Sequence, residues 1–204
     1  MTVEEMARGA SFKQTIDRER FLLGRLMAKG LIARLEKIRP DDIEVLTGKN
    51  GKPFAARGGQ RLWTNFNISH SGDFLAIALS YKEVGVDIEQ VRNFDFQAIL
   101  TDTFSANEIE YIQKSENPLS TFFLLWTRKE ALLKYAGVGL TDTLPDIQLL
   151  EGENDLDMPF LPMESCCQIV SAKGLEGHVI SVCCEYIPSQ TVIFMRPEAS
   201  ILFS

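Results

Sequence analysis

The chain has 204 residues, of which 45% are hydrophobic and 24% charged, and this composition is typical of a soluble globular protein of one domain or two small halves. Its formal net charge of −7 argues against a general nucleic-acid-binding protein, which would be basic, and no apolar run approaches the roughly 20 residues that cross a bilayer. The N-terminus lacks the apolar core of a signal peptide, so we expect a cytoplasmic protein that functions without nucleic acid or membrane.

The first half of the chain is predicted to fold as one long helix followed by strands. Apolar residues recur at spacings of three, four and seven over 12–38, which predicts a helix there. The stretch 48–53 is rich in turn-forming residues, and Ser71-Gly72-Asp73 suits a tight hairpin. Strands are predicted at 43–47, 62–69, 74–80 and 84–89.

The second half is predicted to contain two helices and then more strands. Ser105 and Glu108 have the spacing of a capping box, which predicts a helix that continues to about Lys114. Asn117-Pro118 predicts the start of another helix, and Gly137 predicts its end. The pattern predicts an α+β fold of two similar halves, 1–95 and 96–204. Strands are predicted at 146–150, 166–172, 178–187 and 191–195, with a loop at 151–164.

The four cysteines form two adjacent doublets, Cys166-Cys167 and Cys183-Cys184. Neighbouring residues of a strand face opposite ways, so a doublet is poorly placed to bind one metal ion, and the spacing matches no zinc motif. We interpret these residues as small buried side chains in a reducing compartment, with a disulfide between the doublets as the alternative.

Two acidic residues share one face of the strand predicted at 84–89. Alternate side chains of a strand point the same way, so Asp87 and Glu89 project together while Val86 and Ile88 face the core. Carboxylate oxygens are the ligands that Mg²⁺ prefers, so the pair could hold a divalent cation. Taken alone, the pattern is equally that of a strand with a solvated polar face.

The helix after Pro118 carries a second charged group. Trp126, Glu130 and Lys134 are spaced at i, i+4 and i+8 and therefore lie along one stripe. Because the helix is otherwise strongly apolar, we expect this stripe at the edge of the core. Lys129 points about 100° away from Glu130 and is interpreted as a solvated charge. Carboxylates on two elements with a fixed ammonium suit chemistry on a phosphate ester or anhydride.

A third polar segment contains Ser69 and His70. Adjacent strand residues face apart, so the two cannot form a nucleophile–base pair, but a hydroxyl and an imidazole can donate hydrogen bonds to phosphate oxygens. Lys52 lies in the turn-rich stretch, which lacks the Gly-Lys-Ser/Thr ending of a P-loop.

Together these segments resemble the 4′-phosphopantetheinyl transferases of the Sfp type, over roughly residues 4–140. The early pattern of Arg8, Phe12, Asp17, Arg18 and Arg20 is similar as well. Four motifs in the family's order carry the resemblance: Gly51-Lys52-Pro53, Phe66-Asn67-Ile68-Ser69-His70-Ser71-Gly72, Gly85-Val86-Asp87-Ile88-Glu89 and Trp126-Thr127-Arg128-Lys129-Glu130-Ala131-Leu132-Leu133-Lys134.

The resemblance implies two similar α+β halves related by a pseudo-twofold axis. Each half has a small, mainly antiparallel sheet packed with a long helix, and coenzyme A is bound between them. It also implies a monomer that transfers the 4′-phosphopantetheine arm of coenzyme A to a serine of an apo acyl carrier or peptidyl carrier protein and releases 3′,5′-ADP.

The resemblance further assigns site residues. Asp87, Glu89 and Glu130 would bind Mg²⁺, with Mn²⁺ as a substitute, and Lys134 would contact the pyrophosphate. Glu130 would serve as a metal ligand, as the base for the attacking serine, or as both. Asp87, Glu130 and Lys134 would thus be catalytic, and the coenzyme A contacts would come from Arg8, Arg20, Lys52, Ser69, His70 and Lys134.

Two other functions fit part of the pattern, and the partner surface can be predicted. A non-catalytic coenzyme A-binding protein would be expected to lack Asp87, Glu130 or Lys134, and a Mg²⁺-dependent phosphohydrolase would explain neither Lys52 nor the segment with His70. We expect the carrier protein to dock on residues 94–116. The aromatic residues of this segment, Phe94, Phe96, Phe104 and Tyr111, would supply apolar contacts, and basic residues such as Arg92, just before it, and Lys114 would orient the approach. The alternative is that these aromatic residues fill the core of the second half.

Overall fold

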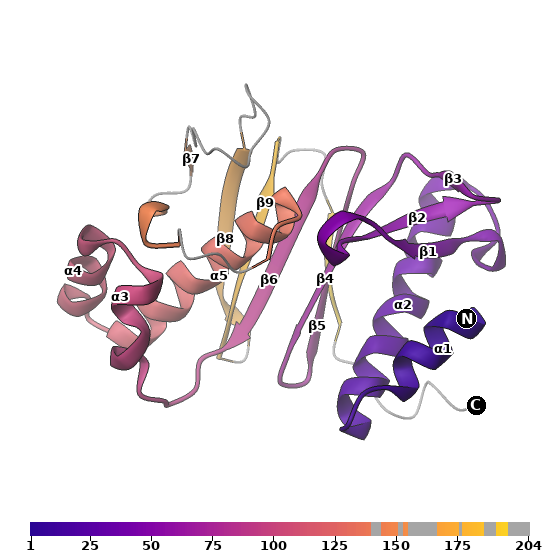
Figure 1. Ribbon diagram of the computed structural model, residues 1–204. Helices are drawn as coiled ribbons and strands as arrows, with labels where there is room; N and C mark the ends of the chain where they lie inside the picture. The colour runs from indigo at the N-terminus through magenta and orange to yellow at the C-terminus, as the bar shows by residue number, and fades with distance from the viewer. Residues whose placement is uncertain (140–143, 151–152, 155–166, 176, 186–190, 196–204) are drawn as a thin grey trace.

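The computed structural model describes residues 1–139, 144–150, 153–154, 167–175, 177–185 and 191–195 and confirms the α+β class (Figure 1). The α-helices are α1 (Val3–Ala10), α2 (Thr15–Glu36), α3 (Leu100–Thr103), α4 (Ala106–Lys114) and α5 (Pro118–Ala136). Short 3₁₀ turns lie at Pro40–Asp42, Lys49–Gly51, Phe96–Ile99 and Leu144–Asp146.

The strands of the described residues pair antiparallel in three sheets. The first has the order β1 (Glu44–Thr47), β2 (Pro53–Arg57) and β3 (Gln60–Arg61). The second has the order β10 (Thr191–Met195), β5 (Phe74–Ser80) and β4 (Asn65–Ser71). The third has the order β6 (Val84–Gln90), β9 (His178–Cys184), β8 (Cys167–Leu175) and β7 (Glu153–Asn154).

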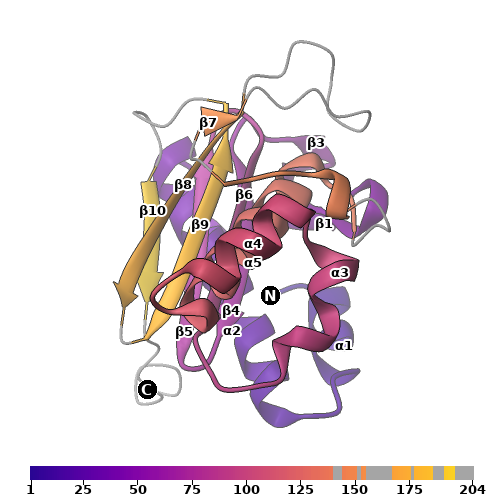
Figure 2. The ribbon, with the colours of Figure 1, turned by 90° about the vertical axis from the view of Figure 1, so that its left-hand side faces the viewer.

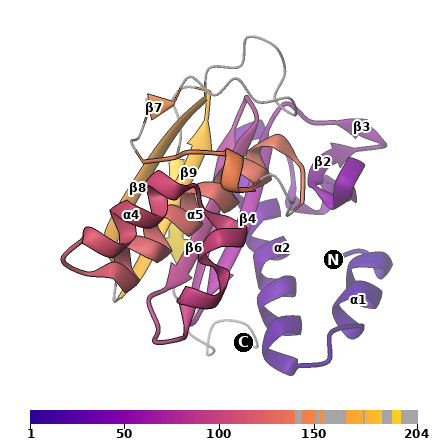
Figure 3. The same cartoon turned by 60° about the vertical axis from the view of Figure 1, so that its left-hand side comes forward.

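The helices and strands lie in separate layers, and the helices fall into two groups. Figure 2 shows β8, β9 and β10 together in one layer, apart from α3, α4 and α5. In Figures 1 and 3, α1 and α2 lie on one side of the molecule, α3 to α5 lie on the other, and β4, β5 and β6 run between them. Helix α5 packs against β6 and β9. No described helix combines the length and apolar character that crossing a membrane requires.

Local signals account for the ends of the long helices. The Asn117 side chain accepts a hydrogen bond from the Ser120 backbone at the start of α5, and Gly137 ends the helix at φ 67°, both as predicted. Ser105 and Glu108 form the predicted capping box of α4. Helix α2 begins three residues later than predicted and ends before Lys37, which adopts a left-handed conformation.

Helix α1 was not predicted, and its packing explains why. It buries Glu5, which forms an ion pair of 2.8 Å with Lys29 of α2, and it buries Gly9, where an added Cβ would lie 3.0 Å from Leu22. The buried face of α1 thus has an ion pair and a glycine where large apolar residues would be expected. The spacing of Thr2 and Glu5 is nevertheless that of a capping box, which forms in the structure and was overlooked as a signal for this helix.

The strand predicted at 146–150 is wrong. Ile147 and Leu149 are buried and alternate with an exposed Gln148, as in a strand, but this backbone pairs with none of the strands among the described residues. Instead, the Arg128 guanidinium donates to the carbonyl oxygens of Leu149 (3.0 Å) and Leu150 (2.6 Å). Side chains of α4 and α5 thus satisfy backbone groups that a sheet would otherwise pair.

The prediction that Lys129 is solvated is also wrong, for a related reason. Its side chain is 1% exposed and forms an ion pair of 2.9 Å with the fully buried Glu108 of α4. The ammonium also donates to the Leu144 and Ile147 carbonyls. Lys129 therefore links the segment 144–147 to helices α4 and α5.

The other strand predictions are confirmed apart from their ends, but β2, β3 and β7 were missed, and β7 lies within the loop predicted at 151–164. The hairpin between β4 and β5 turns at Gly72, whose φ is 56°. Cys167 and Cys183 have free, buried thiols in the core beneath α5, as predicted, and burial raises the pKa of Cys183. Cys166 and most of the predicted loop at 151–164 lie outside the described residues.

Strands from the two halves of the sequence pair with each other. Strand β10, from the end of the chain, pairs with β5, and β6 from the first half pairs with β9. Two of the three sheets therefore contain strands from both halves. The boundary near residue 95 and the pseudo-twofold relation stay predictions.

Candidate functional site

The site forms where β4, β6 and α5 meet, and a glycine permits this meeting. A Cβ added to Gly85 of β6 would lie 2.0 Å from the Ala131 carbonyl oxygen and 2.4 Å from the Tyr135 nitrogen of α5. Helix and strand backbones are therefore in direct contact at this point. The contact brings the face of α5 that carries Glu130 and Lys134 against β6.

Asp87 lies at the centre of this junction. Its side chain is 4% exposed, and Oδ1 accepts hydrogen bonds from the Ser69 hydroxyl (2.8 Å) and the Lys134 ammonium (2.5 Å). Oδ2 is buried and has no hydrogen-bond partner among the residues that the structure describes. Burial raises the pKa of the Asp87 carboxyl, although Lys134 and Ser69 oppose the shift.

The carboxylates of Glu89 and Glu130 lie near Asp87 and Lys134. Glu89 accepts a hydrogen bond from the Ser71 hydroxyl at 2.8 Å. Burial raises the pKa values of both Glu89 and Glu130, and the charge of nearby Asp87 raises them further. Val86 and Ile88, which alternate with the acidic residues, are fully buried, as predicted. Three acidic side chains thus interact around one lysine.

This donor set fits a divalent cation. Asp87 Oδ2 is an orphaned oxygen inside the protein, and Glu89 and Glu130 carry charge that Lys134 alone does not neutralise. Hard oxygen ligands are what Mg²⁺ selects. Among the described residues, however, no three acidic, histidine or cysteine side chains are gathered as closely as a preformed metal site requires. The side chains would have to converge when the ion binds.

A basic edge borders the carboxylates. His70 is partly exposed, but desolvation of its ring by neighbouring groups lowers its pKa, and the charges of Arg20 and Lys134 lower it further. Arg20 reaches from α2 to the hairpin, where it donates to the Gly72 carbonyl, and it lies 3.6 Å from Asp17. The structure therefore brings together three of the predicted anion-binding side chains: Arg20, His70 and Lys134.

Lys52 and Arg8 lie farther from the carboxylates. Lys52 donates to Glu83 (2.6 Å) and to the Tyr135 carbonyl (2.8 Å), so it lies at the C-terminal end of α5. Arg8 is exposed, and its guanidinium lies 6.0 Å from the centre of the Phe21 ring. Neither has a hydrogen bond or ion pair to Asp87, Glu89 or Glu130 within the described part of the chain.

Ser69 has a different role from the one expected of a simple phosphate donor. Its hydroxyl donates to Asp87 and accepts from Lys134 (3.0 Å) and from the Ile88 backbone (3.4 Å). A hydroxyl has one proton and two lone pairs, so this one is fully used, and contact with a phosphate would require it to rotate. Sequence reasoning assigned no role to Ser71 or Asn67, although small polar residues alternate through this strand.

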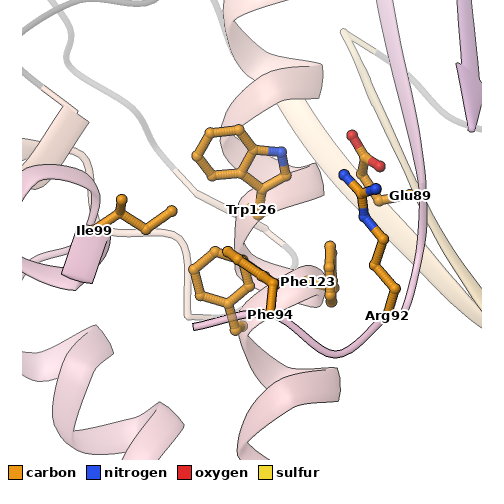
Figure 4. Close-up of a pocket in the computed structure, with 7 residues that line it drawn as sticks. Glu89, Arg92, Phe94, Ile99, Phe123 and Trp126 are labelled. Carbon is orange, nitrogen blue, oxygen red and sulfur yellow. The ribbon is translucent and has the colours of Figure 1, made fainter. Parts of the chain in front are cut away.

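An apolar pocket of about 180 Å³ lies beside Glu89 (Figure 4). Glu89 and Arg92 lie next to each other on one side of it, and Phe94, Phe123 and Trp126 lie around the rest. Phe94 is 41% exposed. Of the other aromatic residues in the expected docking segment, Tyr111 is exposed, Phe96 packs against the core, and Phe104 is wholly within it, which corrects its assignment to the surface.

Comparisons with known proteins agree with this picture. Residues 83–183 match the family model described as the 4′-phosphopantetheinyl transferase superfamily, and residues 1–82 match the one described as 4′-phosphopantetheinyl transferase, N-terminal. The 4′-phosphopantetheinyl transferase psf-1 of Bacillus pumilus is 31% identical over 90% of this chain and 78% of its own length. A putative 4′-phosphopantetheinyl transferase of Synechocystis is 33% identical over 79% of this chain, which spans 66% of that protein. The 4′-phosphopantetheinyl transferase Sfp of Bacillus subtilis is 28% identical over 82% of this chain and 74% of its own length.

Proposed function

This chain belongs to the 4′-phosphopantetheinyl transferase superfamily, and from this premise we propose its substrates and its reaction. It transfers the 4′-phosphopantetheine arm of coenzyme A to a serine of an apo acyl carrier or peptidyl carrier protein, in a Mg²⁺-dependent reaction that releases 3′,5′-ADP. Coenzyme A binds between the halves 1–95 and 96–204. The observation that carries the proposal is the cluster of Asp87, Lys134 and Ser69 on three elements, with Glu89 and Glu130 beside it.

The carboxylates are assigned to the metal. Asp87, through Oδ2, would hold Mg²⁺ together with Glu89 and Glu130, and Mn²⁺ could take its place. When bound, the ion supplies charge neutralisation at the pyrophosphate oxygens. The orphaned oxygen of Asp87 and the mutual repulsion of the three groups support this assignment.

The remaining roles follow from position and charge. Lys134 approaches the pyrophosphate with its ammonium and stabilises the leaving oxygen. Arg20 and His70 contact the 3′-phosphate and neighbouring groups of the nucleotide, and their proximity to Lys134 supports this. Arg8, Lys52 and Ser69 stay in the predicted coenzyme A-binding set.

Glu130 is the best-placed base for the serine. Burial and its acidic neighbours raise the pKa of its carboxyl, which increases its affinity for a proton. The serine hydroxyl gives its proton to Glu130, directly or through water, while its oxygen attacks the β-phosphorus. The bond to the bridging oxygen breaks, and 3′,5′-ADP leaves with the bonding electron pair.

The exposed part of the pocket beside Glu89 is assigned to the carrier protein. The attacking serine must reach Glu130, and Phe94 and Arg92 lie at the pocket on this side of the site. An apolar residue next to a basic one suits a partner helix that combines apolar and acidic residues.

The test is to incubate the protein with coenzyme A, Mg²⁺ and an apo-carrier protein and to measure the mass of the carrier. Transfer adds about 340 Da, the mass of the phosphopantetheine arm. A phosphohydrolase would release inorganic phosphate and leave the carrier unchanged, and a non-catalytic binding protein would do neither. EDTA should abolish the mass shift, and excess Mg²⁺ should restore it.

Two substitutions control this assay. Glu130→Gln should abolish transfer, because it removes both a metal ligand and the proton acceptor. Glu110→Gln, on the exposed face of α4, should leave the rate unchanged, since Glu110 is exposed and pairs with the exposed Lys114. An active Glu130→Gln protein would contradict the assignment of Glu130.

A further inference from the structure

Strands β4 and β6 lie next to each other but belong to different sheets. In three of the hydrogen bonds between them, a side chain of β4 accepts from a backbone N–H group of β6. Every one of these bonds spans 19 residues, so the two strands run parallel with a constant offset. The pairs are Asn67 Oδ1 with Val86 N (3.0 Å), Ser69 Oγ with Ile88 N (3.4 Å) and Ser71 Oγ with Gln90 N (2.9 Å).

These three side chains, which we call the β4 ladder, satisfy an edge of the third sheet. Strand β6 is at the edge of its sheet and pairs with β9. On its other side, alternate N–H groups pair with no strand of the described residues. Val86 and Ile88 are fully buried, and an unpaired N–H group there would be costly. Alternate residues of β4 share one face, so a single strand can supply all three acceptors.

The two serines of the ladder also hold the carboxylates. The Ser69 hydroxyl donates to Asp87 and the Ser71 hydroxyl donates to Glu89, each at 2.8 Å. Each serine therefore accepts from one residue of β6 and donates to the carboxylate of the residue before it. Asn67 accepts from the Val86 backbone but has no carboxylate to hold, because the residue before Val86 is Gly85, which has no side chain.

We propose that Ser71, together with Ser69, is a positioning residue that orients the carboxylates of Asp87 and Glu89 toward a shared divalent cation. This inference rests on the proposed metal site. Glu89 is only partly buried, so without Ser71 its side chain could adopt several rotamers. Hydrogen-bond partners of metal ligands reduce this freedom, and their loss typically weakens metal binding by about 10–100-fold.

Ser71 is the better residue to test, because Ser69 also contacts Lys134. Ser71→Ala removes a ladder bond and a carboxylate bond, whereas Asn67→Ala removes a ladder bond alone. Ser71→Thr retains the hydroxyl. The experiment titrates each full-length variant with Mn²⁺ alone, measures free and bound Mn²⁺ by electron paramagnetic resonance, and records the melting temperature.

We expect about tenfold weaker Mn²⁺ binding for Ser71→Ala and wild-type affinity for Ser71→Thr. Asn67→Ala should lower the melting temperature but leave the Mn²⁺ affinity unchanged. Equal losses of affinity in Ser71→Ala and Asn67→Ala would show that the ladder is merely structural and would overturn the proposal. Unchanged affinity in Ser71→Ala would overturn it too.

A wild-type protein that binds no Mn²⁺ would instead refute the metal site of the proposed function. In that case, amide hydrogen exchange of the metal-free protein tests whether Ser71 bonds the backbone of β6. Protection of the Gln90 amide that is lost in Ser71→Ala and kept in Asn67→Ala would support Ser71 as a specific link in the ladder. A Gln90 amide that exchanges equally fast in the wild type and in Ser71→Ala would overturn the role of Ser71 in the β4 ladder.

Discussion

Gly85→Ala tests whether direct contact between α5 and β6 assembles the site. The new Cβ would lie 2.0 Å from the Ala131 carbonyl oxygen, and an ordinary contact begins near 3.4 Å, so the helix would have to retreat by up to 1.4 Å. Overpacking of this kind costs about 1–3 kcal/mol, and in a chain of this length each kcal/mol lowers the melting temperature by roughly 2–4 °C.

The same retreat would affect the chemistry. Lys134 lies 2.5 Å from Asp87, and a shift of the helix would lengthen that contact and move Glu130 away from Glu89. A displacement of about 1 Å at a reacting group can reduce the rate about a hundredfold. We therefore expect Gly85→Ala to lose much more activity than its modest loss of stability would explain.

The assay is the carrier mass shift, followed over time at a temperature where the variant is folded by circular dichroism. Gly30→Ala is the matched control. Gly30 lies in α2, nothing lies within 4 Å of its added Cβ, and alanine there should stabilise the helix by about 0.5–1 kcal/mol without changing activity. A Gly85→Ala protein with wild-type activity would refute the idea that this contact sets the geometry of the site.

Four other substitutions test separate parts of the structure. Asp87→Asn should keep the fold but abolish transfer and weaken Mn²⁺ binding; a wild-type rate would refute its assignment. His70→Ala should raise the KM for coenzyme A about tenfold to a hundredfold, and more than the KM for dephospho-coenzyme A, because a 3′-phosphate contact is lost. Equal effects on both substrates would place His70 elsewhere. Phe94→Glu should raise the KM for the carrier protein and leave the KM for coenzyme A unchanged; a change in neither would move the docking surface. Lys129→Met leaves Glu108 buried without its partner and should cost about 3–5 kcal/mol in thermal unfolding, whereas loss of the exposed pair of Lys114 should cost at most about 1 kcal/mol.

Much of this site could be predicted because its signals are local. The alternation of strand residues predicted that Asp87 and Glu89 share a face, and helical spacing predicted the stripe of Trp126, Glu130 and Lys134. Trp126 and Glu89 line one pocket, and Lys134 pairs with Asp87, so the relative placement of the two segments is as the motifs implied.

The failures have a common physical origin in long-range pairing. Lys129 looked solvated because helical geometry says only which way a side chain points, and its partner Glu108 comes from another helix. The pairing of β10 with β5 depends on which strand edges the rest of the chain leaves unpaired, and a local sequence pattern does not show this. The role of Ser71 was missed because both of its hydrogen-bond partners lie 18 or 19 residues away, on a strand with which β4 forms no sheet.

Under the proposed function, the charge balance at the junction would favour binding of coenzyme A together with the metal. When ionised, Asp87, Glu89 and Glu130 carry three negative charges against the single positive charge of Lys134. That excess would repel a pyrophosphate, and one divalent cation would cancel it. In the proposed reaction, an acidic protein can then bind a polyanionic substrate without a basic surface, because the ion and Arg20 would supply positive charge beside the phosphates, and His70 would donate a hydrogen bond. The small residues of β4 and β6 allow this: Gly85 admits the helix, and Ser69 and Ser71 link the strands while holding two of the three carboxylates.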